Sequence, residues 1–278
     1  MFQVRMTDKW KTAALAVGLA ILAYAAAARP GPFARPTPAP KTEQGTVGSS
    51  ELGGGPEKSN RVLGEFDLAR LFPEIVLRQG EPRRKTVALT FDDGPDGTFT
   101  PRILDVLANK GVKGTFFLVG KRLDEHPEVV RRIVAEGHAV GNHTFSHMNI
   151  TRFTLKEIED EVRRADQALS KYGIELRGMF RPPYGAVDVS SAEMLGKAGY
   201  RLCLWSVDSL DWRGLNRDQV IGNVVPLVGN GSVVLFHSAG GPGEDLTGTV
   251  EALPAIIDDL RAKGYEFVTI PEMFPLQR

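Results

Sequence analysis

The sequence predicts an α/β fold in which about seven parallel β/α units form a barrel or near-barrel. Two observations lead to this prediction. Several runs are apolar nearly throughout, as the strands of a parallel sheet covered on both faces are, and helical patterns lie between most of these runs. The candidate strands are residues 86–91, 114–119, 138–142, 178–182, 201–207, 232–237 and 266–270.

Helices between these strands are predicted from apolar periodicity and from end signals. On the segment from Leu155, one face carries Leu155, Ile158, Val162, Ala165 and Leu169, as an amphipathic helix requires. Helices are predicted to end at left-handed glycines, namely Gly111, Gly137, Gly173, Gly199 and Gly264.

Three helix starts and one irregularity are also expected. Segments 154–157 and 190–193 begin with Thr or Ser and end with Glu, the spacing of a capping box. Residues 100–101, Thr-Pro, predict an N-cap followed by proline at the first helical position. Pro254 falls inside the last helical pattern, so this helix is predicted to start later than its periodicity suggests.

The N-terminal part predicts export. Residues 1–28 contain Arg and Lys followed by an uncharged Ala/Leu-rich run, which is typical of a signal peptide and is also long enough for an uncleaved membrane anchor. In either case the positive flank stays in the cytoplasm and the rest of the chain is delivered outside. Residues 29–60 are rich in Pro, Gly and Ser and predict a linker. Residues 61–278 are predicted to form one catalytic domain.

Composition limits the classes of partner. The 278 residues include 34 Lys and Arg and 34 Asp and Glu, so the formal net charge is zero. A polyanion such as nucleic acid is therefore not expected as a partner. A neutral ligand is expected instead. The single cysteine, Cys203, lies in an apolar run and is interpreted as a small buried side chain. Two isolated histidines, His126 and His138, are interpreted as surface or cap residues.

Polar residues follow most of the predicted strands. They are Asp92 and Asp93 after the first, 142–147 after the third, 181–184 after the fourth, 208–212 after the fifth, and His237 at the end of the sixth. Because the carboxyl ends of parallel strands carry the catalytic residues of β/α barrels, these residues are expected to form one site.

His143 and His147 are candidate metal ligands. Four residues apart on a helical turn, their Cβ atoms would lie roughly 5–6 Å from each other, and two imidazoles at that spacing can bind one zinc ion. One of Asp92 and Asp93 would supply a third ligand, and the other would be free to act as a base. The charge of the cation would keep both carboxylates ionised at neutral pH.

Each of these signals has a structural alternative. The two histidines could be surface residues, aspartate before glycine is ordinary in turns, Arg181 could form a surface ion pair, and Trp212 could be a core aromatic. Their joint position at strand ends favours the catalytic interpretation.

The chain from about residue 85 to residue 271 resembles the polysaccharide deacetylase family, also called the NodB-homology domain or carbohydrate esterase family 4. Five motifs occur in the order of that family. They are TFDDG at 90–94, HTFSH at 143–147, RPPY at 181–184, DSLDW at 208–212 and LFH at 235–237. The segment LFPEIVLRQG before the first motif is similar to exported deacetylases of bacterial cell walls.

This resemblance implies a distorted (β/α)7 barrel and a role for each residue that matches a motif. The implied metal ligands are Asp93, His143 and His147. The implied catalytic residues are Asp92 as base, His237 as acid, Arg181 to orient Asp92, and Asp211 to hold His237. The implied substrate contacts are the Tyr184 main-chain N–H, which would face the oxyanion, and Trp212 and Leu235, which would line the acetyl pocket. Ser238 departs from the aspartate that many members carry after the histidine.

The implied activity is the metal-dependent removal of acetyl groups from N-acetylglucosamine residues of a cell-wall polysaccharide, with release of acetate. The ion is expected to be Zn²⁺, although Co²⁺, Ni²⁺, Fe²⁺ or Mn²⁺ could bind the same ligands. The expected partner is peptidoglycan or a chitin-like polymer, with no nucleic acid and with membrane contact through residues 1–28 alone. The protein is expected to be monomeric and to act at the bacterial cell surface or wall.

Rival functions were weighed against the same residues. Glycosidase carboxylates lie about 5–9.5 Å apart on either side of the scissile bond, which neighbours such as Asp92 and Asp93 cannot easily match. A metalloprotease is disfavoured because HTFSH lacks the glutamate of HExxH. A non-catalytic glycan-binding or wall protein on the same barrel, and an O-acetyl esterase, remain as alternatives.

Overall fold

The computed structural model describes residues 65–174, 178–241 and 243–275. The predicted signal or anchor, the whole of the predicted linker and residues 61–64 of the predicted catalytic domain lie outside the described residues. Within the described ranges, no helix is long and apolar enough to cross a membrane.

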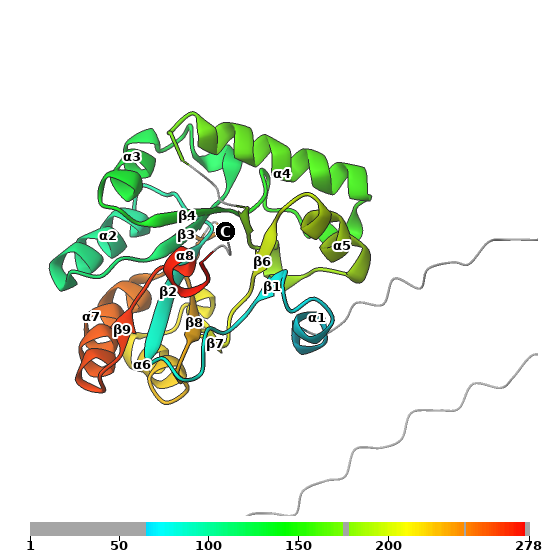
Figure 1. Cartoon of the computed structure of the whole chain (residues 1–278). Helices are drawn as coiled ribbons and strands as arrows, with labels where there is room; N and C mark the ends of the chain where they lie inside the picture. The colour runs from blue at the N-terminus through cyan, green and yellow to red at the C-terminus, as the bar shows by residue number, and fades with distance from the viewer. Residues whose placement is uncertain (1–64, 175–177, 242, 276–278) are drawn as a thin grey trace, which may run out of the picture. The chain divides into compact units, whose positions relative to one another are not determined.

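Parallel strands form one curved sheet, and helices surround it (Figure 1). The strands are β1 (Val76–Leu77), β2 (Thr86–Asp92), β3 (Thr115–Leu118), β4 (Ala139–Asn142), β5 (Met179–Phe180), β6 (Arg201–Cys203), β7 (Val207–Asp208), β8 (Ser232–His237) and β9 (Glu266–Phe267). Their order in the sheet is β1-β6-β5-β4-β3-β2-β8-β7, with β9 beside β2. The predicted α/β fold, a distorted barrel, is confirmed.

The two edges of this sheet are connected by one stretch of chain. Residues 201–207 were expected to form a single strand, and this expectation is wrong. Residues 201–203 pair with β5 and β1 at one edge, whereas residues 207–208 pair with β8 at the other. The Ser206 N–H donates to the Val233 carbonyl at 2.9 Å, so the chain passes from one edge to the other between these two short strands.

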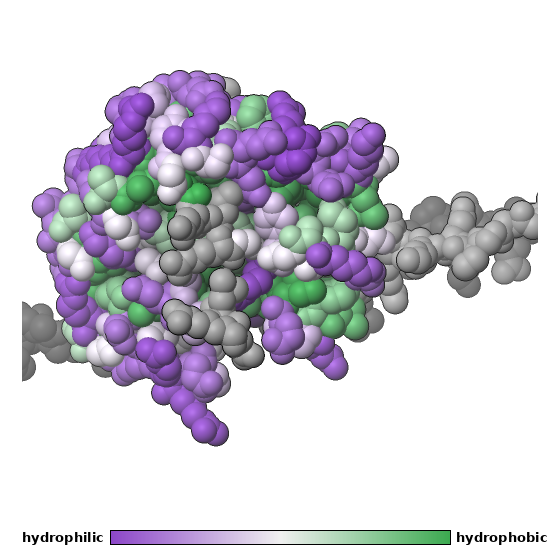
Figure 2. Space-filling view, turned by 45° about the horizontal axis from the view of Figure 1, so that its top comes forward, coloured by the Kyte–Doolittle hydropathy of each residue, from purple (hydrophilic) through white to green (hydrophobic). Residues whose placement is uncertain are grey.

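The helices are α1 (Glu65–Leu71), α2 (Phe99–Lys110), α3 (Pro127–Ala135), α4 (Leu155–Ser170), α5 (Val189–Lys197), α6 (Arg217–Val224), α7 (Thr247–Ala262) and α8 (Ile270–Met273). All but α8 lie on the outer side of the sheet (Figure 1), whereas α8 contributes Ile270 to the apolar cluster in the barrel interior. All five predicted helix-ending glycines have positive φ. Figure 2 shows that hydrophilic side chains cover most of the visible face, with apolar residues in small patches between them.

Several local predictions are corrected by the structure. The capping box at 154–157 forms at the start of α4, but the one at 190–193 does not, because α5 begins two residues earlier with Asp188 as its N-cap. Helix α2 begins at Phe99 rather than after Thr100, and the Asp96 carboxylate accepts the N–H groups of residues 98–100. Pro254 lies within α7, which starts at Thr247.

Two further differences concern strands. The strand predicted at 178–182 is reduced to β5, and the strand predicted at 266–270 is reduced to β9, after which the chain turns into α8. Strand β1 and helix α1, which precede the first motif, were missed because two paired residues and seven helical residues carry too little periodicity to be recognised.

The alternation of side chains along β2 sets the position of the site. Leu89 and Phe91 point outward into the core beneath the helices, where Phe91 stacks on Phe116 at 5.0 Å. Ala88 points to the other face and packs in the barrel interior. Thr90 and Asp92 therefore also face the interior, and Asp92 is the last residue of the strand. The first catalytic carboxylate candidate thus lies at the carboxyl end of the barrel.

Candidate active site

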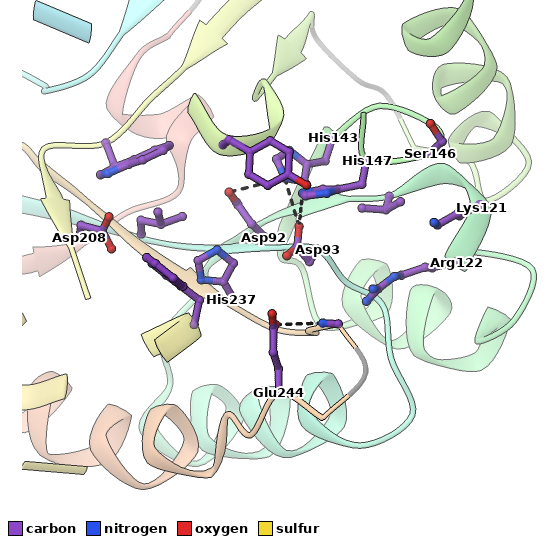
Figure 3. Close-up of a pocket in the computed structure, with 16 residues that line it drawn as sticks. Asp92, Asp93, Lys121, Arg122, His143, Ser146, His147, Asp208, His237 and Glu244 are labelled. Atoms are coloured by element: carbon purple, nitrogen blue, oxygen red, sulfur yellow. Dashed lines mark hydrogen bonds and ion pairs between the residues drawn. The ribbon is translucent and has the colours of Figure 1, made fainter. Parts of the chain in front are cut away.

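A cavity of about 520 Å³ lies at the carboxyl ends of β2, β7 and β8 and beside the loop that follows β4. Nearly all of the predicted site residues line this cavity: Asp92, Asp93, His143, His147, Tyr184, Trp212, Leu235 and His237. Figure 3 shows the labelled carboxylates and imidazoles pointing toward its centre. The two remaining predicted residues, Arg181 and Asp211, lie behind it and contact the side chains that line it.

The backbone separates the two adjacent carboxylates. Asp92 is in the strand, whereas Asp93 adopts a left-handed conformation with φ of 70°, which is uncommon for a residue other than glycine. The Asp92 side chain contacts Arg181, and the Asp93 side chain contacts His143 and His147. Two like charges are therefore tolerated next to each other in sequence because each has its own cationic or polar partner.

Arg181 is fully buried and holds Asp92 by its guanidinium group. Its Nη1 donates to Asp92 Oδ1 at 2.7 Å and to Thr90 Oγ1 at 2.8 Å. Its Nε donates to the Cys203 carbonyl at 2.7 Å, and its plane lies 4.1 Å above the Phe117 ring. With every side of the cation in contact with protein, the Asp92 carboxylate is held in one orientation.

Asp93, His143 and His147 form a cluster that fits a single metal ion. Asp93 Oδ1 lies 3.2 Å from His143 Nε2 and 3.0 Å from His147 Nε2. Two donors at 2.0–2.1 Å from a tetrahedral zinc ion would lie about 3.3 Å apart. Asp93 Oδ1 is also buried without a hydrogen bond of acceptable geometry. This atom thus has a ligand's position and lacks another partner.

The charge state of Asp93 also suits a metal ligand. Burial by itself would raise the pKa of this carboxyl, but the imidazoles of His143 and His147 outweigh burial and lower the pKa below its usual range. Asp93 is therefore ionised at neutral pH, as a carboxylate ligand must be.

The tautomer of His143 is fixed from behind. Its Nδ1 lies 2.7 Å from the Arg181 carbonyl, and since a carbonyl only accepts, Nδ1 carries the proton. Nε2 is then the nitrogen available to an ion at the cluster, an arrangement typical of metal-binding histidines. His147 packs its ring against the edge of Tyr184, with ring centroids 4.9 Å apart.

The loop that carries both histidines is held by a network outside the cavity. Thr144 and His147 both have φ of 63°, an unfavourable conformation for these residues. The Thr144 N–H donates to Asn142 Oδ1 at 2.8 Å, and the His147 N–H donates to Thr144 Oγ1 at 2.9 Å. Asn142 Nδ2 donates in turn to Asp166 Oδ1 at 2.5 Å, and the Tyr200 hydroxyl donates to the other Asp166 oxygen. These bonds offset the cost of the two left-handed residues.

His237 is held by Asp211 in the tautomer that an acid requires. Asp211 Oδ1 accepts from His237 Nδ1 at 2.7 Å, and Asp211 Oδ2 accepts from the His237 main-chain N–H at 2.9 Å and from Thr249 Oγ1 at 2.8 Å. Burial alone would lower the pKa of His237, but the bond to Asp211 and the nearby carboxylates raise it to about 9. His237 is thus protonated at neutral pH and exposes Nε2 to the cavity.

Comparison with known proteins places this geometry in a family. Residues 79–203 match the polysaccharide deacetylase family model. A peptidoglycan-N-acetylglucosamine deacetylase of Bacillus cereus is 41% identical over 195 residues, which cover 70% of this chain and 70% of the relative.

The chain belongs to the polysaccharide deacetylase family. Members of this family are metal-dependent hydrolases that act on amide bonds. A crystal structure of a peptidoglycan N-acetylglucosamine deacetylase with a bound N-hydroxybenzamide ligand superposes with a TM-score of 0.72 and 37% identity, covering 75% of this chain and 97% of the other. The same fold also occurs in a pseudoenzyme of the family from Bacillus anthracis, with a TM-score of 0.66, 28% identity and coverage of 71% and 68%.

Because the family includes a pseudoenzyme, the fold by itself does not decide activity in this polysaccharide deacetylase. The chemistry of the cavity does. Here the metal-ligand cluster, a carboxylate beside it and a protonated histidine opposite all face the same space.

The cavity has further lining residues that the sequence did not indicate. They are Val119, Lys121, Arg122, Trp205, Gly241 and Glu244. Ser146 and Asp208, which belong to the predicted polar segments but had been given no role, also line the cavity. Most follow strand ends, which is the signal that could have found them. Trp205 could not be found in this way because it lies in a stretch that had been predicted as the interior of a strand.

Three residues singled out in the sequence do not line the cavity of this deacetylase, namely Ser238, His126 and His138. The Ser238 hydroxyl donates to the Asp92 carbonyl at 3.1 Å and so contacts the candidate base rather than the candidate acid. His126 precedes α3 as its N-cap residue. His138 is buried, and its Nδ1 accepts the Gly114 N–H at 3.0 Å. His126 and His138 both lie outside the cavity.

Replacing Arg181 by Met is expected to destabilise the fold by about 3–5 kcal/mol, because Asp92 would be left as a buried carboxylate without its cation. Chemical denaturation measures this loss. Arg163→Met is a matched control, since Arg163 pairs with Asp160 at 2.9 Å on the exposed face of α4, where such a pair contributes less than about 1 kcal/mol. Equal losses of unfolding free energy in the two variants would contradict the greater contribution of the buried Arg181–Asp92 pair.

Replacing Asp166 by Ala is expected to weaken metal binding by about tenfold without removing any ligand, because the support of the histidine loop through Asn142 is lost. Competition with a chelator measures the affinity. Asp160→Ala, on the exposed face of the same helix, serves as the control and should bind metal as the unaltered protein does. Unchanged affinity in Asp166→Ala would show that the loop holds its shape without this network.

Proposed function

We propose that this protein is an exported, metal-dependent deacetylase that hydrolyses the acetamide of N-acetylglucosamine residues in peptidoglycan. The observation that carries this proposal is the meeting of three groups in one cavity. They are the cluster of Asp93, His143 and His147, the Asp92 carboxylate, and the protonated His237. The glycan is taken from the Bacillus cereus relative, whose name states peptidoglycan N-acetylglucosamine as its substrate.

Amide hydrolysis needs a better electrophile, an activated water and a protonated leaving group. A divalent ion held by Asp93, His143 and His147 would polarise the acetamide carbonyl and favour the deprotonation of water. We propose Zn²⁺, which suits two imidazoles and one carboxylate with an open position, although Co²⁺, Ni²⁺, Fe²⁺ and Mn²⁺ are compatible with the same donors.

Asp92 acts as the general base in this proposal. Its buried carboxylate, oriented by Arg181, accepts a proton from water as the oxygen of that water attacks the carbonyl carbon. The main-chain N–H of Tyr184 donates to the negative charge that develops on the carbonyl oxygen, a contact typically worth about 10²–10³ in rate.

His237 acts as the general acid. Its Nε2 delivers a proton to the departing nitrogen as the carbon–nitrogen bond breaks, so that one water and one acetamide yield acetate and an amine. Asp211 keeps Nδ1 protonated and stabilises the positive charge of the ring. Trp212 and Leu235 line the cavity and would surround the acetyl methyl group.

Export is part of this proposal because peptidoglycan lies outside the cytoplasmic membrane. Residues 1–28 would act as a signal peptide or anchor, residues 29–60 as a linker, and residues 61–278 as the catalytic domain of a monomer. Amino-terminal sequencing of the protein recovered from the cell surface separates cleavage from retention.

Acetate release tests the activity and its rivals together. We expect release from N-acetylglucosamine oligomers or from peptidoglycan, its loss with a chelator and its return with Zn²⁺. Release from acetylated xylan alone would favour an O-acetyl esterase. No release from any of these substrates, with glycan binding retained, would favour a non-catalytic wall protein such as the family's pseudoenzyme.

Asp92→Asn is expected to keep its metal and to lose turnover by about 10²–10⁴, since the base is removed and all three ligands remain. His143→Ala is expected to lose both metal and turnover. Metal content by elemental analysis, together with acetate release, measures the two effects. If both variants lost metal equally, the division between ligand and base would be wrong.

Asp211→Asn is expected to shift the alkaline limb of the pH–rate profile to lower pH. His237 must be protonated to act as an acid, and Asp211 raises its pKa to about 9. Without that carboxylate the pKa falls toward its ordinary value of about 6.5, so activity is lost at lower pH. A bound metal ion would be present in both the unaltered protein and Asp211→Asn, so it does not change the direction in which the pKa of His237 shifts. An unshifted alkaline limb would exclude His237 as the titrating acid.

A further inference from the structure

Most charged side chains at the rim of the cavity are separated by sign, and Glu244, whose carboxylate accepts the Gly241 N–H at 2.9 Å, lies between the two groups (Figure 3). Lys121 and Arg122 line one side, in the 3-10 turn Gly120–Arg122 that follows β3. Asp208 lines the other side, at the end of β7. Figure 3 shows these residues on opposite sides of Asp92, Asp93 and His237. The reactive groups therefore lie between a cationic end and an anionic end.

Sheet order explains this separation. Strands β2 and β8, which carry the reactive groups, lie between β3 and β7. With about 4.8 Å between neighbouring strands, β3 and β7 are about 14 Å apart along the curved sheet. This span exceeds the reach of one acetamide, so a glycan bound at the centre would extend toward the charges at either end.

The cationic end is fixed to the metal-ligand loop. The Gly120 N–H donates to the Thr144 carbonyl at 3.0 Å, and the Lys121 N–H donates to the Phe145 carbonyl at 2.9 Å. A side chain at Gly120 would place Cβ 2.7 Å from the Phe145 ring, so only glycine permits this close approach. Lys121 is thus carried at a fixed distance from His143 and His147, although its own side chain is exposed.

The two cations differ in their freedom to bind a ligand. Arg122 Nη2 donates to the Gly240 carbonyl at 3.0 Å and so connects the turn to the loop after β8. Lys121 Nζ has no hydrogen bond or ion pair with any residue that the structure describes. An ammonium group without a protein partner at the rim of a substrate cavity is available for an anion.

We propose that Lys121, supported by Arg122, forms a subsite for a carboxylate carried by the sugar next to the one that is deacetylated. This inference rests on the proposed function and specifies its substrate class. Peptidoglycan carries carboxylates on its peptides, or on its lactyl groups where the peptides are absent, whereas chitin carries none. Asp208 at the other end repels a carboxylate and so disfavours the reverse orientation of the strand.

Binding measured apart from turnover tests the subsite. In the Asp92→Asn background, calorimetry compares three ligands: a peptide-free peptidoglycan tetrasaccharide with free lactyl carboxylates, the same glycan with its peptides, and chitotetraose. Lys121→Met is expected to weaken binding of a carboxylate-bearing glycan by about fivefold, the effect of one solvent-accessible ion pair. The peptide-free and peptide-bearing glycans show which carboxylate is bound.

Three further measurements make the result specific. Lys121→Arg should retain the tighter binding of the carboxylate-bearing glycans over chitotetraose. Lys113→Met should not change this difference in affinity, because Lys113 is exposed on the loop before β3, away from the cavity. Higher salt should reduce the difference in the Asp92→Asn protein but not in the protein that also carries Lys121→Met. Equal weakening of chitotetraose, or no weakening of either carboxylate-bearing glycan, would overturn the subsite. Absence of acetate release by the protein with Asp92 intact would instead count against the proposed function.

Discussion

The buried ion pair between Arg181 and Asp92 is the interaction on which the rest of the site depends. The guanidinium bonds reach β2 through Asp92 and Thr90 and reach β6 through the Cys203 carbonyl. The Arg181 main-chain carbonyl in turn sets the tautomer of His143. One residue therefore fixes both the proposed base and one proposed metal ligand. A buried charge pair of this kind is a weak source of stability by itself. Loss of either partner is nevertheless costly, because the remaining charge stays buried without a counter-charge.

Each reactive group in the cavity is supported by a group that does not touch the substrate. Asp211 stands behind His237, Asn142 with Asp166 stands behind the histidine loop, and Arg181 stands behind Asp92. Such support fixes side chains before substrate binds, so little reorganisation is needed during the reaction. Two of the positive-φ residues at the cavity, Thr144 and His147, are kept in place by the bonds of the histidine loop.

The sequence predicted the fold and the location of the site because both depend on local patterns. Apolar strands ending in polar motifs indicate a parallel barrel and its active end. The choice of Asp93 over Asp92 as a ligand, and the separate roles of Arg181, His237 and the other site residues, required the family resemblance. The break in residues 201–207 was not predictable, because an apolar run does not record that its two halves pair with opposite edges. Asp166 and Tyr200 were likewise hidden, since their roles arise from contacts between α4, β4 and the start of β6 that no spacing encodes.

Anomalous X-ray diffraction at the absorption edge of the bound metal tests the central claim most directly. A single peak is expected at about 2.0–2.2 Å from an Asp93 carboxylate oxygen and from Nε2 of both His143 and His147. Asp92 should remain paired with Arg181 and outside the ligand distance. A metal peak coordinated by Asp92 in place of Asp93, or one away from the two histidines, would contradict metal binding by Asp93, His143 and His147.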